Sequence, residues 1–195
     1  MNKYTLKNEL MENVRNRMDA DRYNHTLGVA YTAASLAMCY GKEQEFIDRA
    51  FIAGLLHDLA KCIPSEELLA NCIRYGIEIT DCERRNPFLL HGKLGAYYTA
   101  NEFKINDEDI INAITWHTTG RPDMSCLEKI IFIADYIEPQ RYKQKNLCEI
   151  REMAFSDIDK CVYQIARDTI EYITSNNKDL DEMTVKTAEY YKGYC

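Results

Sequence analysis

Two aspartates follow directly on apolar helical stretches. Asp58 comes after His57 and the apolar run at residues 50–56, and Asp135 comes after five apolar residues at 130–134. A helix that is apolar on every face is buried nearly all round. A carboxylate in such a setting is rarely tolerated unless it is paired or binds a metal. The sequence therefore predicts a cation where these two acids lie.

All of the histidines in the chain also lie beside apolar helical stretches, and they are His25, His57, His91 and His117. Any one of them alone would more commonly be an ordinary core or surface histidine, but their joint occurrence with two such acids favours metal ligands. Imidazole and carboxylate suit Fe, Mn or Zn, and the lack of paired cysteines argues against a structural zinc site. The two oxygens of Asp58 could reach two divalent ions roughly 3.5–4 Å apart, the spacing used in phosphoryl displacement.

Basic and hydroxyl side chains near these ligands are candidates for binding phosphate. Lys61, one helical turn after His57, is predicted to act with Asp58 in catalysis, although a lysine near a helix C-terminus is also favoured by the helix dipole. The segment after His117 could hold phosphates through hydroxyls, backbone and guanidinium, or simply end a helix; it consists of Thr118, Thr119, Gly120 and Arg121. Arg141 is a further candidate.

Helical periodicity runs through nearly the whole chain, with little of the alternation typical of strands. We expect an all-α fold with helices near residues 5–18, 22–40, 43–60, 65–75, 91–103, 107–118, 125–138, 147–154, 157–175 and 181–191. His57 and Asp58 would then lie on the third helix, and residues 76–90 would form the longest irregular connection. Without a repeat or a linker, residues 1–195 are predicted to form a single domain.

Composition and charge argue against several classes of partner. The chain has 195 residues, 46% of them hydrophobic, and a formal net charge of −7, which disfavours binding to nucleic acid or to an anionic membrane. The most apolar stretches are too short to span a bilayer. The start of the chain is polar, and eight scattered cysteines include no CxxC pair, so we expect reduced thiols and a cytoplasmic location. The oligomeric state stays open.

The order His25, His57-Asp58, His91, His117, Asp135 resembles the HD-domain metal-dependent phosphohydrolases, in the dinuclear variant with two additional histidines before the final aspartate. The similarity covers about residues 20–142, and no ligand position departs from the pattern. The surrounding sequences look most like the YqeK-type members of the family, which are bacterial symmetrical diadenosine tetraphosphate (Ap4A) hydrolases; they read RYNHTLGVA, AGLLHDLAK, HGKLGA, ITWHTTGRP and IFIADYIEPQR.

This resemblance implies an all-α HD bundle and a small-molecule substrate, a dinucleoside polyphosphate or nucleotide. It implies two divalent transition-metal ions, with iron favoured and manganese as the alternative, and cleavage of Ap4A into two ADP by a metal-bridging hydroxide. By analogy with dinuclear HD sites, one metal would be held by His25, His57, Asp58 and Asp135. The other would be held by Asp58, His91 and His117.

Three alternatives remain open from the sequence. The same chemistry could act on another nucleotide or phosphate ester, because pocket size decides the substrate. A non-catalytic regulatory module could bind metal or nucleotide. The loss of a metal ligand would favour this alternative, and no ligand is lost here. A di-iron oxygenase with this ligand set would consume oxygen.

Overall fold

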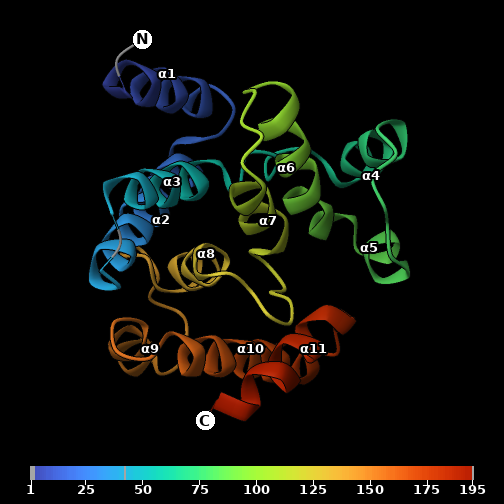
Figure 1. Cartoon of the computed structure of the whole chain (residues 1–195). Coiled ribbons are helices and arrows are strands. Elements are labelled where there is room, and N and C mark those ends of the chain that lie inside the picture. The colour runs from blue at the N-terminus through green and yellow to red at the C-terminus, as the bar shows by residue number, and fades with distance from the viewer. Residues whose placement is uncertain (1–2, 42, 195) are drawn as a thin grey trace.

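The computed structural model describes residues 3–41 and 43–194, and this part of the chain is helical throughout, with no strand (Figure 1). This confirms the predicted fold class. The helices are α1 (Lys3–Arg15), α2 (Ala20–Cys39), α3 (Gln44–Leu56), α4 (Ser65–Arg74), α5 (Asp81–Arg85), α6 (His91–Asn101), α7 (Glu108–Trp116), α8 (Cys126–Ile137), α9 (Leu147–Ala154), α10 (Ile158–Ser175) and α11 (Glu182–Tyr191), with short 3-10 helices η1 (Pro87–Leu90) and η2 (Lys192–Tyr194).

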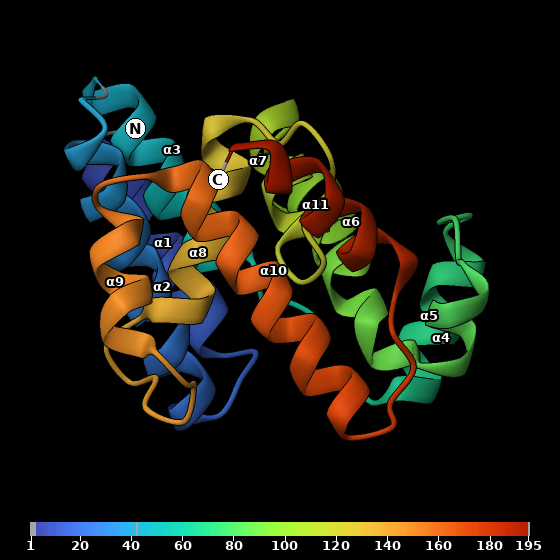
Figure 2. The ribbon, with the colours of Figure 1, turned by 90° about the horizontal axis from the view of Figure 1, so that it is seen from below.

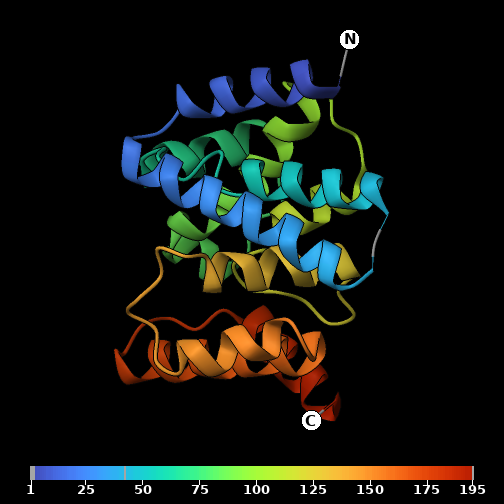
Figure 3. The ribbon, with the colours of Figure 1, turned by 90° about the vertical axis from the view of Figure 1, so that its left-hand side faces the viewer.

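Helix α8 lies at the centre of the molecule and contacts α2, α3, α7, α9 and α10. It begins at a capping box, in which Ser125 and Glu128 each bond a backbone N–H of the other. The residues at 130–134 are all buried, as expected for a helix that is covered on nearly every side. Figure 3 shows α8 between the α2–α3 pair and a layer formed by α9, α10 and α11.

Helices α2 and α3 pack along each other. The buried residues of α2 recur at intervals of three and four, as in an amphipathic helix; they are His25, Thr26, Val29, Ala30, Ala33, Leu36 and Ala37. Nearly every residue of α3 from 50 to 56 is buried as well. His25 therefore lies on the face of α2 that is directed into the core.

Helix α3 ends earlier than the sequence predicts. It stops at Leu56, and the following turns are tighter, with the N–H of Leu59 bonded to the carbonyl of Leu56 at 3.1 Å and that of Lys61 to the carbonyl of Asp58 at 2.9 Å. These i to i+3 bonds are typical of a helix end that has tightened. His57 and Asp58 thus lie in a turn and not on a helix.

The segment at residues 76–90 is also more ordered than expected. It contains α5, which begins at a capping box between Thr80 and Glu83, and η1, which begins at Pro87. A proline at the first helical position needs no N–H partner. The 3-10 helix leads directly into α6, whose first residue is His91.

The C-terminal helices form a layer against α8, seen from below in Figure 2. Helix α10 buries Cys161, Val162, Ile165 and Ala166, one stripe of an amphipathic helix. No helix within residues 3–41 and 43–194 is both long and apolar enough to cross a membrane. The seven cysteines of the described part are free thiols, and Cys195 lies outside it.

Candidate metal centre

Helix α2, the turn after α3, the start of α6 and the end of α7 bring the histidines together. His25 lies in α2, His57 in the turn after α3, His91 at the start of α6, and His117 at the end of α7. In three of them Nδ1 bonds the backbone carbonyl three residues earlier: His57 to Gly54 at 2.7 Å, His91 to Phe88 at 2.6 Å, and His117 to Ile114 at 2.7 Å. A carbonyl only accepts hydrogen bonds, so the proton of each neutral ring lies on Nδ1 and Nε2 carries a lone pair.

The fourth histidine is oriented by a carboxylate. Nδ1 of His25 lies 3.1 Å from Oε1 of Glu138, whose side chain is buried. The other oxygen of Glu138 accepts a hydrogen bond of 2.7 Å from the backbone N–H of Gln140. A carboxylate on the far nitrogen of a metal-binding imidazole fixes its tautomer and raises its basicity. Sequence reasoning missed Glu138, although it lies three residues after Asp135, close to the same face of a helix.

The two carboxylate oxygens of Asp58 face different histidines. Oδ2 lies 3.7 Å from Nε2 of His25 and 3.4 Å from Nε2 of His57. Oδ1 lies 3.3 Å from Nε2 of His91 and 3.6 Å from Nε2 of His117. Asp58 thus lies between two pairs of imidazoles, in the arrangement needed for a carboxylate that bridges two ions.

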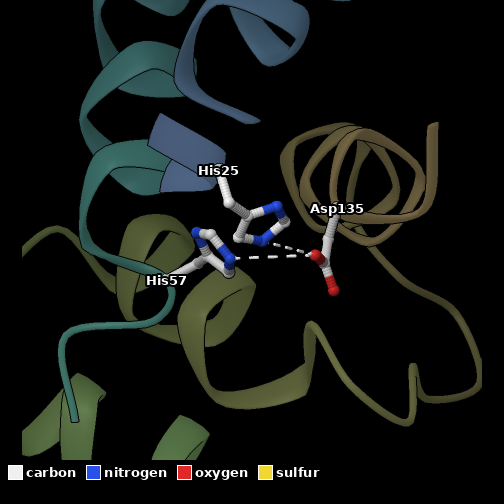
Figure 4. A group of neighbouring side chains, drawn as sticks. All are labelled: His25, His57 and Asp135. Atoms are coloured by element: carbon white, nitrogen blue, oxygen red, sulfur yellow. Dashed lines mark ion pairs between the residues drawn. The ribbon is translucent and has the colours of Figure 1, made fainter. Parts of the chain in front are cut away.

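Asp135 completes the side of the centre that His25 and His57 form (Figure 4). Its Oδ1 lies 3.1 Å from Nε2 of His25 and 3.9 Å from Nε2 of His57. The Asp135 side chain is 25% exposed, whereas that of Asp58 is 3% exposed. The centre is therefore open to solvent at Asp135 and closed at Asp58.

The donor atoms fit a divalent transition metal. Nε2 of His25 and Nε2 of His57 are buried and have no hydrogen-bond partner among the described residues. Nε2 of His91 lies 3.0 Å from Nε2 of His117, and two lone pairs cannot bond each other. Two nitrogens that bind the same metal would lie about 3 Å apart, given metal–nitrogen bonds of about 2.0–2.1 Å. A cation would account for the unpartnered nitrogens of His25 and His57 and for the close approach of His91 to His117.

The acids of the centre are held in their charged form. Burial raises the pKa of Asp58, but its close contacts with His57, His117 and His91 outweigh burial and hold its pKa well below the usual value. Burial likewise raises the pKa of Asp135, but its close contacts with His25, His57 and Arg141 outweigh burial and hold its pKa well below the usual value. Ionised carboxylates are the form that binds metal.

His91 is held in its neutral form, mainly by burial. Burial lowers its pKa to about 4, and the nearby Lys61 and His117 lower it as well, although Asp58 acts in the opposite direction. A neutral imidazole is the state that can donate a lone pair to a metal.

Three basic side chains surround the centre. Arg22 donates to Oδ2 of Asp58 at 2.8 Å, Arg141 donates to Oδ1 of Asp135 at 2.6 Å, and Nζ of Lys61 lies 3.1 Å from Nε2 of His91. Sequence reasoning named Lys61 and Arg141 but missed Arg22, which lies three residues before His25 on the same helix, a spacing that places both on one face. The three bases offset the three acids Asp58, Asp135 and Glu138, so the net charge of the site would come from bound metal.

Some residues after His117 contact the metal centre, and others contact the core. Oγ1 of Thr118 lies 3.2 Å from Nε2 of His117 and 3.4 Å from Nε2 of His91, at the centre. Thr119 bonds the carbonyl of Gly120, which has a φ of +64° and ends the turn.

Arg121 donates to both oxygens of the buried Glu128, at 2.6 Å and 2.8 Å. Its guanidinium therefore anchors the start of α8, and it is not brought to the metal ligands. The phosphate-binding role expected for Arg121, and for Thr119 and Gly120, stays a prediction.

Comparison with known proteins agrees with this geometry. The family model for the HD domain matches residues 22–140. The chain belongs to the HD domain family. A solved structure of a predicted HD superfamily hydrolase involved in NAD metabolism, from Clostridium acetobutylicum, matches with a TM-score of 0.91 and 39% sequence identity, over 97% of this chain and 98% of that one. The bundle expected from the resemblance is thereby confirmed.

Two curated bacterial relatives match over nearly their whole length. A Halalkalibacterium halodurans protein is 37% identical over 93% of this chain and 94% of its own. A Bacillus subtilis protein is 36% identical over 88% of this chain and 90% of its own. Both carry the name symmetrical bis(5'-nucleosyl)-tetraphosphatase.

Proposed function

We propose that this HD-domain protein is a symmetrical bis(5'-nucleosyl)-tetraphosphatase, a metal-dependent hydrolase that cleaves Ap4A into two ADP. The names of the relatives above support the substrate. The observation that carries the chemistry is the position of Asp58, whose two oxygens face two separate pairs of histidines. A two-metal site is a recurrent device for displacement at phosphorus.

One ion would be held by His25, His57, Asp135 and one oxygen of Asp58, and the other by His91, His117 and the second oxygen of Asp58. Imidazole and carboxylate donors suit iron, with manganese as the alternative. Two divalent ions bound here would lower the pKa of a water and neutralise charge on phosphoryl oxygens.

The side chains around the ligands would position the phosphate chain. Lys61, Thr118 and Arg141 all lie within hydrogen-bond distance of ligand residues, so a phosphate at the centre would be within their reach. The departing ADP is a weak base, because the second pKa of a terminal phosphate is about 6. Little help from a general acid is then needed, which fits a site whose carboxylates stay ionised.

A product assay tests the proposal. Protein loaded anaerobically with Fe²⁺, or with Mn²⁺, is incubated with Ap4A, and the nucleotides are separated by ion-exchange chromatography. ADP as the sole product is expected, and a chelator should abolish turnover. Formation of ATP and AMP, or no turnover with any of several metals, contradicts the proposal.

A substrate panel distinguishes the rival functions. Faster cleavage of NAD, a nucleoside monophosphate or a cyclic dinucleotide would identify another phosphate ester or anhydride as the substrate. Binding of Ap4A without turnover would favour a regulatory module, and oxygen consumption would favour an oxygenase.

A further inference from the structure

A cavity of about 450 Å³ adjoins the metal centre. Helix α5, the start of α6, the end of α7 and the start of α11 surround it, and their places are seen in Figure 1. Thr118 and Thr119 are part of its wall. Because Oγ1 of Thr118 is also 3.2 Å from Nε2 of His117, the cavity and the centre share this residue.

The basic residues that line this cavity are all engaged by acids. Arg85 binds Asp179 at 2.9 Å, Lys93 binds Glu83 at 2.8 Å, and Lys186 binds Glu182 at 2.8 Å. Two further acids, Asp81 and Asp181, also line the cavity. Such a wall repels a phosphate group. The phosphate chain would instead lie at the centre, where bound metal ions would supply the net positive charge.

The rest of the lining suits a nucleoside. Trp116, Leu89 and Met183 supply aromatic and apolar surface, and an indole is a strong platform for stacking a base. Thr118 and Thr119 add hydroxyls, and Asp81 and Asp181 add acceptors for ribose hydroxyls or an exocyclic amine. The volume lies within the range of about 300–1,000 Å³ that is common for small-molecule sites.

We propose that this cavity binds one adenosine half of the substrate, with the base against Trp116 and the phosphates leading past Thr118 to the metals. The inference rests on the proposed function, because it takes a dinucleoside polyphosphate as the ligand. In this arrangement the metal centre is the cationic region that binds phosphate, and the cavity is the uncharged or acidic region that binds the nucleoside.

Intrinsic fluorescence tests the assignment directly, because Trp116 is the single tryptophan of the chain. Manganese-loaded protein is titrated with ADP, with adenosine and with pyrophosphate. ADP and adenosine are expected to change the Trp116 emission to saturation, and pyrophosphate is expected to leave it unchanged. No response to ADP, or an equal response to ADP and pyrophosphate, overturns the inference.

A charged substitution in the wall gives a second measurement. Met183→Glu removes an apolar contact and adds an acid, and it should weaken ADP binding and raise the KM for Ap4A about tenfold with little change in kcat. The matched control is Met38→Glu, which makes the same change at an exposed methionine of α2 and should behave as the unmodified protein. Unchanged ADP binding and KM in Met183→Glu would overturn the inference.

The two proposals fail in different ways. If Ap4A is not cleaved symmetrically but ADP still alters the Trp116 emission and Met183→Glu weakens that response, the proposed function fails and the nucleoside site stands. If Ap4A is cleaved to ADP while the emission and the Met183→Glu variant both remain unaffected, only the nucleoside site is wrong.

Discussion

Oε2 of Glu138 lies where a side chain at position 28 would have to be. A Cβ built on Gly28 would come within 2.5 Å of this oxygen, whereas the other oxygen of Glu138 contacts Nδ1 of His25 at 3.1 Å. Gly28 lies in α2 three residues after His25. The absence of a side chain at this glycine is therefore what lets a buried carboxylate reach the histidine.

Gly28→Ala is expected to weaken metal binding. The new methyl group would displace Glu138, and loss of such a carboxylate partner lowers metal affinity about 10–100-fold. Metal content per chain after dialysis, measured by mass spectrometry, checks this. Gly193→Ala is the control, because nothing lies within 4 Å of a Cβ there. Full metal occupancy in Gly28→Ala would contradict the steric argument.

Two substitutions of Glu138 separate its charge from its hydrogen bond. Glu138→Gln keeps an oxygen that can accept from His25, whereas Glu138→Ala leaves the buried ring N–H without this partner. We expect Ala to lower metal affinity by about 10–100-fold and Gln to lower it less, as measured by competition with a chelating dye. Equal losses would mean that the negative charge alone matters.

Asp58 and Asp135 should differ in how much metal their loss removes. Asp58→Ala is expected to abolish both metal binding and Ap4A cleavage, because its oxygens face both histidine pairs. Asp135→Ala is expected to lose only the ion near His25 and His57. Metal analysis with far-UV circular dichroism distinguishes these results from unfolding. Retained activity in Asp58→Ala would remove its bridging role.

Lys61 should act on the substrate and not on the metals. Lys61→Ala is expected to lower kcat/KM for Ap4A about 10–100-fold, since a hydrogen bond to a charged group contributes about 1.5–3 kcal/mol. Metal content should stay unchanged, because Lys61 carries no ligand atom of the proposed set. If metal content falls in step with activity, Lys61 has a structural role at His91 instead.

The ion pair at the start of α7 should make stability depend on pH. Arg49 binds both oxygens of Asp107 at 2.7 Å. Burial raises the pKa of Asp107, but the Arg49 bond and charge and the backbone N–H donors outweigh it and lower the pKa. The stabilisation is therefore fully present above the unfolded-state pKa of about 3.9 and is lost as pH falls through the lower folded-state pKa.

Asp107→Asn isolates this effect, since asparagine caps a helix about as well as aspartate does. Urea unfolding of both proteins should show a lower free energy of unfolding for the variant at pH 7, and the difference should shrink below pH ~3.9. A difference that is the same at pH 7 and in acid would show that Arg49 and Asp107 contribute no charge-dependent stability.

Some features of the molecule follow from short-range patterns in the sequence. The spacing of apolar residues determines α2, α3 and α8 and their buried faces, because a helix places residues three and four apart on one side. The acids at 58 and 135 stand out for the same reason, because each lies at the end of an apolar run. The tight turn at His57 was not predictable from this spacing, because the apolar pattern continues through it.

Only the tertiary structure decided which side chains meet. His25 and Glu138 are 113 residues apart in sequence, and Arg22 and Asp58 are 36 apart. Arg121, adjacent in sequence to the segment that holds His117 and Thr118, is turned to Glu128 in the core. Helical periodicity determines which face of each helix is buried, but the packing of α2, α6, α7 and α8 against one another determines which atoms on those faces come within bonding distance.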